Sequence, residues 1–239
     1  MVTPQIVAMG GVGFSLGPGD LPLHRYVLSL AQRDRPAVLL IPTASGDSAT
    51  YVTDFFATYG SLECRPSYLP LFKATPADLR SLLLAQDVIY VGGGNTRSML
   101  ALWREWGIDR ILREAWTAGV VLAGVSAGMI CWFAQGVTDS VLGSTGDPLD
   151  NLSGLICLGF LPGSACPHYD GETNRRPVYR RLVAAGELGD GYAADDGVAL
   201  HFAGRELVRV VGARPGAKAY RVERRGDSAL ETPIAPDHL

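Results

Sequence analysis

Short apolar runs alternate with amphipathic stretches along the first half of the chain. Runs at Gln5–Met9, Ala37–Ile41, 87–91 and 120–123 have the length and composition of buried strands. Between the first two, Pro22–Arg33 carries apolar residues at spacings of three and four, which predicts a helix packed on the sheet. Strands that alternate with helices in this way indicate an α/β fold built around a mostly parallel sheet.

Capping residues add boundaries to this pattern. Ser48 is a helix N-cap candidate for a helix that runs to about Tyr59. Thr75 followed by Pro76 predicts another helix start, with the threonine as N-cap and the helix ending near Ala85. After these, Met129–Ala134 has an apolar helix pattern, and 136–151 is loop-like.

The C-terminal third has a different character. Short β runs at 192–194, 198–202, 207–211 and 218–222 are separated by glycine-containing turns, and we expect them to extend or cap the sheet edge. The chain contains no internal repeat and no linker. We therefore expect a single domain over residues 1–239, in which the tail beyond about Arg225 could be loose.

Composition narrows the function classes. The 239 residues include 21 basic and 24 acidic side chains, a net charge of −3, so no basic footprint indicates nucleic acid or an anionic membrane as a partner. Apolar residues make up 47% and charged residues 19%, a balance typical of a folded chain. Every apolar run is far shorter than the roughly 20 residues that cross a bilayer. Without a signal-peptide pattern at the N-terminus, we expect a cytoplasmic protein.

Cysteine and histidine do not form metal motifs. The four cysteines have no CxxC spacing and the four histidines include no HExxH, so we expect reduced thiols, no metal site and no cofactor. Gly11-Val12-Gly13 is a weak match to a dinucleotide fingerprint because Pro18-Gly19 interrupts the helix that such a fingerprint needs.

The strongest chemical motif is Gly124-Val125-Ser126-Ala127-Gly128, a G-x-S-x-G pattern between an expected strand and an expected helix. This is the setting of a nucleophile elbow, in which small flanking residues permit a sharp turn that exposes the serine hydroxyl. The amide of Ala127, at the helix start, can then donate to a developing oxyanion. The plain alternative is a glycine-rich turn with a helix-capping serine.

A nucleophilic serine needs a base, and His168 is the best placed of the histidines. It lies just past an expected strand, where α/β folds place their sites, whereas the others lie in a helix, a late strand and the tail. A carboxylate must orient the imidazole. Asp195 and Asp196, at the end of a short strand, compete for this role with Asp139, and turn chemistry before Gly197 is the alternative reading of the pair.

A second glycine-rich turn, Gly92-Gly93-Gly94-Asn95-Thr96, follows a strand and opens a helix. Its exposed amides could supply a second oxyanion donor. A phosphate cradle is the rival interpretation, but the loop lacks the Gly-Lys-Ser/Thr ending of a P-loop.

Together, the glycine loop, the serine elbow, Pro167-His168-Tyr169 and Asp195-Asp196-Gly197 resemble the dipeptidase E and cyanophycinase family of serine peptidases. The resemblance spans about residues 5–202 and implies a three-layer α/β sandwich similar to the class I glutamine amidotransferase domain. It implies Ser126 as nucleophile, His168 as base and an oxyanion hole from Ala127 and Gly93. The family acid, commonly glutamate, matches Asp196 best.

The same resemblance leaves the substrate open. Dipeptidase E binds an N-terminal aspartate through an arginine directly after Gly-Glu-Thr, whereas here Gly171-Glu172-Thr173 precedes Asn174, and Arg175 comes one residue late. Asparagine cannot form the charge-assisted pair that arginine forms with a carboxylate. We assign Asn95, Asn174 and Arg175 to substrate binding and expect an exopeptidase for short peptides that is not strictly aspartyl-specific.

Three alternatives remain: a carboxypeptidase, a cyanophycinase-like hydrolase of β-Asp-Arg bonds, and a catalytically silent amidotransferase-like binding domain. Intact Ser126 and His168 disfavour the silent domain. As family members are often dimers, the resemblance implies a homodimer or higher homo-oligomer.

Overall fold

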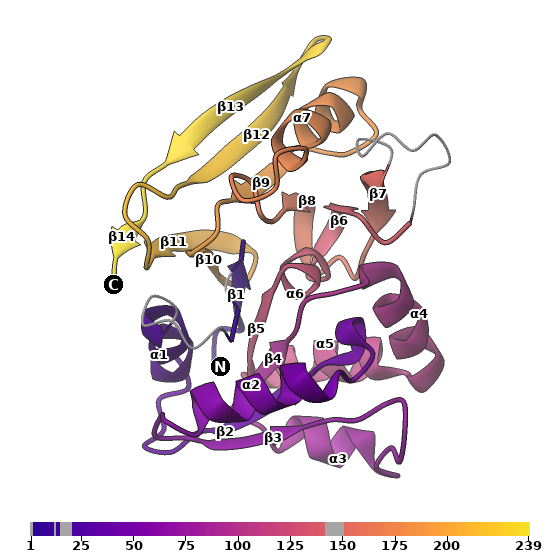
Figure 1. The fold of residues 1–239 in the computed structure, drawn as a ribbon, viewed down its shortest axis with the longest axis vertical. Coiled ribbons are helices and arrows are strands. Elements are labelled where there is room, and N and C mark those ends of the chain that lie inside the picture. The colour runs from indigo at the N-terminus through magenta and orange to yellow at the C-terminus, as the bar shows by residue number, and fades with distance from the viewer. Residues whose placement is uncertain (1, 12, 15–20, 142–150) are drawn as a thin grey trace.

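The computed structural model describes residues 2–11, 13–14, 21–141 and 151–239, which form two sheets and the helices around them (Figure 1). The first sheet has eight strands in the order β14-β11-β10-β1-β5-β4-β2-β3. They are β1 (Gln5–Met9), β2 (Ala37–Ile41), β3 (Arg65–Tyr68), β4 (Val88–Val91), β5 (Val121–Val125), β10 (Val198–Ala203), β11 (Glu206–Gly212) and β14 (Asp237–His238). The five strands from β1 to β3 in this order are mutually parallel, while β10 is antiparallel to β1.

The second sheet has six strands in the order β13-β12-β9-β8-β6-β7. They are β6 (Phe133–Thr138), β7 (Ser153–Ile156), β8 (Leu161–Cys166), β9 (Gly191–Ala194), β12 (Ala219–Arg225) and β13 (Ser228–Ile234). The sequence left open whether the tail beyond about Arg225 is loose. In the structure, residues 228–234 form β13 and pair antiparallel with β12 along their whole length.

Helices flank both sheets (Figure 1). They are α1 (Leu21–Ser29), α2 (Ala49–Tyr59), α3 (Leu79–Leu84), α4 (Thr96–Trp106), α5 (Ile108–Ala118), α6 (Ala127–Ile130) and α7 (Arg175–Ala185), with a short 3₁₀ turn at Thr43–Ser45. Successive side chains of β1 point to opposite faces of the sheet, so they pack in different layers. Ile6 and Ala8 pack with α3, α4 and α5, whereas Val7 and Met9 pack with α1 and α2. Helix α7 packs on the second sheet through Val178, Tyr179 and neighbouring residues.

Most predicted elements are present, and four boundaries differ. Helix α1 ends at Ser29 rather than Arg33, and β6 continues to Thr138, into the stretch predicted as a loop from residue 136. Ser48 caps α2, as predicted. Helix α3, however, begins at Leu79 with Asp78 as its N-cap, so the Thr75 start was wrong: the Asp78 carboxylate accepts from the amide of Ser81. The helix predicted over Met129–Ala134 was also wrong, because α6 ends at Ile130 and strand β6 begins three residues later. Val12 and residues 142–150 of the predicted loop lie outside the described residues.

The strand ends that the sequence highlighted meet where the two sheets adjoin. The glycine loop follows β4, the serine elbow follows β5, and both strands are parallel neighbours in the first sheet. Strands β8 and β9, parallel neighbours in the second sheet, precede His168 and Asp196. An isolated bridge between Gly11 and Asp196 joins the two sets of loops. Within the described ranges, no helix is long and apolar enough to span a membrane.

Candidate active site

Ser126 occupies a strained turn between β5 and α6. Its φ of 57° and ψ of −111° place a non-glycine residue in a region that L-residues rarely adopt. The flanking glycines make this turn possible: a Cβ at Gly124 would lie 2.8 Å from the Cα of Gly128, and a Cβ at Gly128 would lie 2.8 Å from the carbonyl carbon of Val91. The local geometry is that of a nucleophile elbow.

His168 follows β8 and is paired with a carboxylate. Its backbone also has a positive φ, 52°, and its Nδ1 lies 2.8 Å from Oδ1 of Asp196. The His168 side chain is 22% exposed, so part of it is accessible to solvent. A carboxylate on Nδ1 fixes the tautomer that leaves Nε2 free to accept a proton.

Of the three carboxylates that the sequence left in competition, the structure brings Asp196 to His168. The hydrogen bond with His168 holds the pKa of Asp196 below its usual range. Asp195 is 4% exposed, and its Oδ2 instead accepts from the amide of Lys218 at 2.8 Å. Asp139 lies against Arg175, with Oδ1 3.4 Å from a guanidinium nitrogen.

The end of β1 anchors all three positions. Successive carbonyls of residues 9, 10 and 11 accept hydrogen bonds from the amides of Ser126, His168 and Gly197, at 3.3, 3.1 and 2.6 Å. Gly11 also leaves the space in which the histidine and aspartate meet, because a Cβ there would lie 2.6 Å from both His168 Nδ1 and the Asp196 carboxyl carbon. Sequence reasoning missed this role, since Gly11 was noticed only as part of a weak dinucleotide pattern.

Two further side chains hold the Asp196 backbone. The carboxylate of Asp170 accepts from the Asp196 amide at 2.9 Å, and Nε of Arg214 donates to the Asp196 carbonyl at 2.9 Å. Arg214 and Asp170 also form an ion pair with each other. Asp170 and Arg214 therefore hold the loop that carries Asp196 from its exposed side. No local motif in the sequence indicates these contacts.

The two residues assigned to the oxyanion hole lie next to Ser126. Ala127 is the first residue of α6, where a backbone N–H has no acceptor within the helix. A Cβ at Gly93 would lie 3.3 Å from Cβ and 3.8 Å from Oγ of Ser126, so this glycine faces the nucleophile. The Gly93 amide itself donates to the hydroxyl oxygen of Tyr51 at 3.0 Å.

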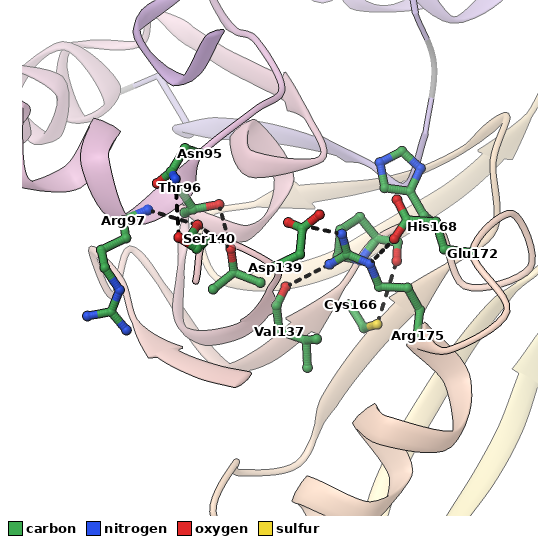
Figure 2. Close-up of polar contacts among 12 residues, drawn as sticks. Asn95, Thr96, Arg97, Val137, Asp139, Ser140, Cys166, His168, Glu172 and Arg175 are labelled. Atoms are coloured by element: carbon green, nitrogen blue, oxygen red, sulfur yellow. Dashed lines mark hydrogen bonds and ion pairs between the residues drawn. The ribbon is translucent and has the colours of Figure 1, made fainter. Parts of the chain in front are cut away.

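Asn95 is engaged within the protein. Its Oδ1 caps α4 by accepting from the Ser98 amide at 2.9 Å, and its Nδ2 donates to the Ser140 carbonyl at 3.2 Å (Figure 2). The side chain therefore fastens the glycine loop to the segment that follows β6.

Arg175 is buried, with only 2% of its side chain exposed. Nε donates to Glu172 at 2.6 Å, one terminal nitrogen donates to the Val137 carbonyl at 3.2 Å, and the other pairs with Asp139 (Figure 2). Burial opposes its charge, but Glu172 and Asp139 outweigh this effect, and the pKa of the guanidinium is raised. Asn174, half-buried at the start of α7, makes no side-chain capping hydrogen bond.

The described part of the chain holds buried thiols and no cluster of metal-binding side chains. All four cysteines are free and buried. Burial raises the pKa of Cys157 and of Cys166 to about 12, so neither thiol ionises at neutral pH. The described residues contain no group of three or more histidine, cysteine or acidic side chains that could hold a metal ion.

Comparison with known proteins decides the family. Residues 6–210 match the profile of Peptidase family S51. The chain belongs to this family of serine peptidases. The four motifs predicted a resemblance to the peptidase E and cyanophycinase family, and the match to family S51 confirms it.

Relatives of this S51 peptidase support the same assignment. The uncharacterized peptidase YgaJ of Bacillus subtilis is 52% identical over 235 residues, covering 98% of this chain and 99% of that protein. The uncharacterized peptidase Lmo0363 of Listeria monocytogenes is 28% identical over 148 residues, covering 61% of this chain and 71% of that protein.

Two solved structures share the fold. A peptidase from an acI-B1 actinobacterium has a TM-score of 0.70 at 18% identity, covering 98% of this chain and 95% of that one. A candidate peptidase E protein of Listeria monocytogenes has a TM-score of 0.61 at 18% identity, covering 98% and 100%. The predicted α/β fold with mainly parallel strands is confirmed.

Proposed function

We propose that this S51 peptidase is an exopeptidase that hydrolyses short peptides through an acyl-enzyme. Ser126 is the nucleophile, His168 the general base and Asp196 the carboxylate that orients the imidazole. The observation that carries the proposal is the 2.8 Å contact between His168 and Asp196, at the same strand end that anchors the strained turn of Ser126.

The chemistry follows from these roles. Ser126 Oγ attacks the scissile carbonyl carbon while His168 Nε2 takes the hydroxyl proton, and the carbonyl electron pair moves to oxygen. Ala127 N–H donates to this oxyanion, and a second donor comes from the side of the glycine loop. Collapse expels the amine, which takes the proton from His168; water then hydrolyses the acyl-enzyme by the same route.

Arg175 bears on specificity. All three of its guanidinium nitrogens are engaged within the protein, and two carboxylates offset its charge, so it is poorly suited to bind an acidic substrate side chain. Position 174, where the resemblance expects an arginine, holds asparagine. Both observations favour an enzyme without strict preference for N-terminal aspartate.

The direct test is hydrolysis of a panel of Asp-X and non-Asp dipeptides, N-blocked peptides and β-Asp-Arg by wild type and Ser126→Ala. We expect turnover of free dipeptides that disappears in the variant. Preferred cleavage of β-Asp-Arg, or of N-blocked peptides at the C-terminal residue, would replace the dipeptidase assignment with one of the alternatives. Absence of turnover across the panel, with equal ligand binding by both proteins, would favour the silent binding domain.

A substitution at position 174 tests the specificity argument separately. Asn174→Arg places a guanidinium where the resemblance expects one, and a charge-assisted pair with the substrate carboxylate contributes roughly 1.5–3 kcal/mol. We expect kcat/KM for Asp-X dipeptides to rise about 10-fold or more, with Ala-X dipeptides as the matched control. An equal change for both substrates would show that position 174 does not contact the substrate side chain.

We also propose that the enzyme is a homodimer and that it works in the cytoplasm. Sedimentation analysis tests the first proposal, and cell fractionation tests the second.

A further inference from the structure

Tyr51 lies against the glycine loop. It is the third residue of α2, and a Cβ at Gly92 would lie 2.7 Å from the Cε1 atom of its ring, so the ring packs directly on the loop. Its hydroxyl oxygen accepts the N–H of Gly93 at 3.0 Å. Phe14 packs edge to face against the same ring, with centroids 5.1 Å apart, which helps to hold the phenol in place.

Within the described ranges, the hydrogen of the Tyr51 hydroxyl has no acceptor. A phenol can accept and donate, and among the described residues its hydrogen bond is the one in which it accepts from Gly93. Accepting a hydrogen bond polarises an O–H group and strengthens it as a donor. Burial raises the pKa of Tyr51 to about 12, so the hydroxyl stays protonated in the neutral range.

Gly93 lies next to both this hydroxyl and the nucleophile. The glycine turns its N–H toward Tyr51 and its Cα toward Ser126, whose Oγ would lie 3.8 Å from a Cβ built there. The position in front of the Gly93 N–H, where an oxyanion would sit if this amide donated directly, is occupied by the Tyr51 oxygen. The Gly93 amide is thus already engaged, and the phenol hydrogen is a candidate donor on the same side of the glycine loop.

We propose that Tyr51 is a catalytic residue that donates its O–H to the oxyanion, with Gly93 acting through it. The inference rests on the proposed function and deepens it. When Ser126 Oγ bonds to the carbonyl carbon, the oxygen that gains the electron pair receives hydrogen bonds from Ala127 N–H and Tyr51 O–H. Tyr51 keeps its proton throughout, and the bond weakens again when the carbonyl re-forms.

The test compares Tyr51→Phe with Tyr59→Phe. Tyr59 is the last residue of the same helix and loses a comparable buried hydrogen bond, at 3.1 Å to Nδ1 of His24 rather than to the glycine loop. Loss of one oxyanion donor costs about 10²–10³ in kcat. We expect Tyr51→Phe to lower kcat by roughly that factor with KM changed less than about 3-fold, and Tyr59→Phe to leave both within about 3-fold.

A second readout does not depend on knowing the substrate. The rate at which a fluorophosphonate labels Ser126 should fall in Tyr51→Phe by a factor similar to that for kcat, because the phosphonyl oxygen develops the same charge. Incorporation of 3,5-difluorotyrosine at position 51 lowers the phenol pKa without removing the ring. We expect it to introduce a loss of kcat at alkaline pH that wild type lacks, which keeps the test valid should Tyr51→Phe fold poorly.

Other results overturn the inference in distinguishable ways. Unchanged kcat and labelling in Tyr51→Phe, with Ser126→Ala inactive, would show that a backbone amide is the second donor and leave the proposed function intact. Increased activity would mean that Tyr51 fills the oxyanion hole in the resting enzyme. Failure of wild type to be labelled at Ser126 would remove the proposed function, and this inference with it.

Discussion

Gly11→Ala isolates the pairing of His168 with Asp196 from the chemistry of either side chain. The new Cβ would lie 2.6 Å from His168 Nδ1 and from the Asp196 carboxyl carbon, and closer still to Oδ1. Real Cβ contacts begin near 3.0 Å, so the carboxylate oxygen must move by more than about 1 Å. The 2.8 Å hydrogen bond between these two residues cannot survive such a shift.

The expected effect is that of losing the orienting carboxylate. Disabling this group in a Ser-His-Asp triad lowers kcat about 10⁴-fold, or about 5.5 kcal/mol of activation free energy. The backbone at Gly11 has no positive φ, so alanine adds no conformational strain of its own. We therefore expect a folded protein with kcat reduced by about 10³–10⁴.

The assay is steady-state hydrolysis of the best dipeptide, with circular dichroism and urea unfolding as checks on folding. Gly189→Ala is the matched control, because its Cβ would contact only Gln135 Oε1, at 3.5 Å, and it should retain wild-type kcat. A folded Gly11→Ala protein with kcat within 10-fold of wild type would refute the reasoning. It would mean that the pairing seen between His168 and Asp196 is not needed for turnover.

Three other predictions concern individual side chains. Asp196→Asn should lower kcat about 10⁴-fold and Asp195→Asn less than 10-fold, because only Asp196 contacts His168; the same hydrolysis assay decides. Burial lowers the pKa of His24 from 6.5 to about 4, so its protonation in the unfolded chain should remove about 3 kcal/mol of stability between pH 7 and pH 4. The contribution of His24 to the free energy of unfolding is present above pH 6.5 and is lost as the pH falls toward 4. The difference in free energy of unfolding in urea between wild type and His24→Gln should therefore decrease over this range. A difference that does not change with pH would contradict a buried neutral imidazole. Arg175→Ala should destabilise the fold by about 1–3 kcal/mol, because it leaves the Val137 carbonyl without its buried donor, whereas Glu172 is 45% exposed and stays solvated; a urea midpoint equal to that of wild type would contradict this.

Local sequence patterns predicted the features that are set by residues close together in the chain. The parallel strands and the Ser126 elbow follow from short apolar runs ending in glycine-rich turns, and the position of His168 follows from the strand before it. The helix predicted over Met129–Ala134 failed because a short apolar run fits a buried helix and a buried strand equally well.

The resemblance matched the family acid to Asp196, but the residues alone left Asp195 and Asp139 open. Asp195 and Asp196 are adjacent at a strand end, where consecutive side chains point to opposite sides, so one faces Lys218 and the other His168. Sequence alone does not set which side faces the histidine. The roles of Gly11 and Tyr51 were missed for a related reason: each depends on contact with residues far away in the chain, and nothing near either residue signals it.

The most direct test of the account is to map where a fluorophosphonate attaches to the wild-type protein, by mass spectrometry of proteolytic fragments. The account predicts one adduct per chain, on Ser126, formed much more slowly in His168→Gln and absent from Ser126→Ala. An adduct on another residue, or none on a folded protein, would contradict the assignment of Ser126 as an activated nucleophile.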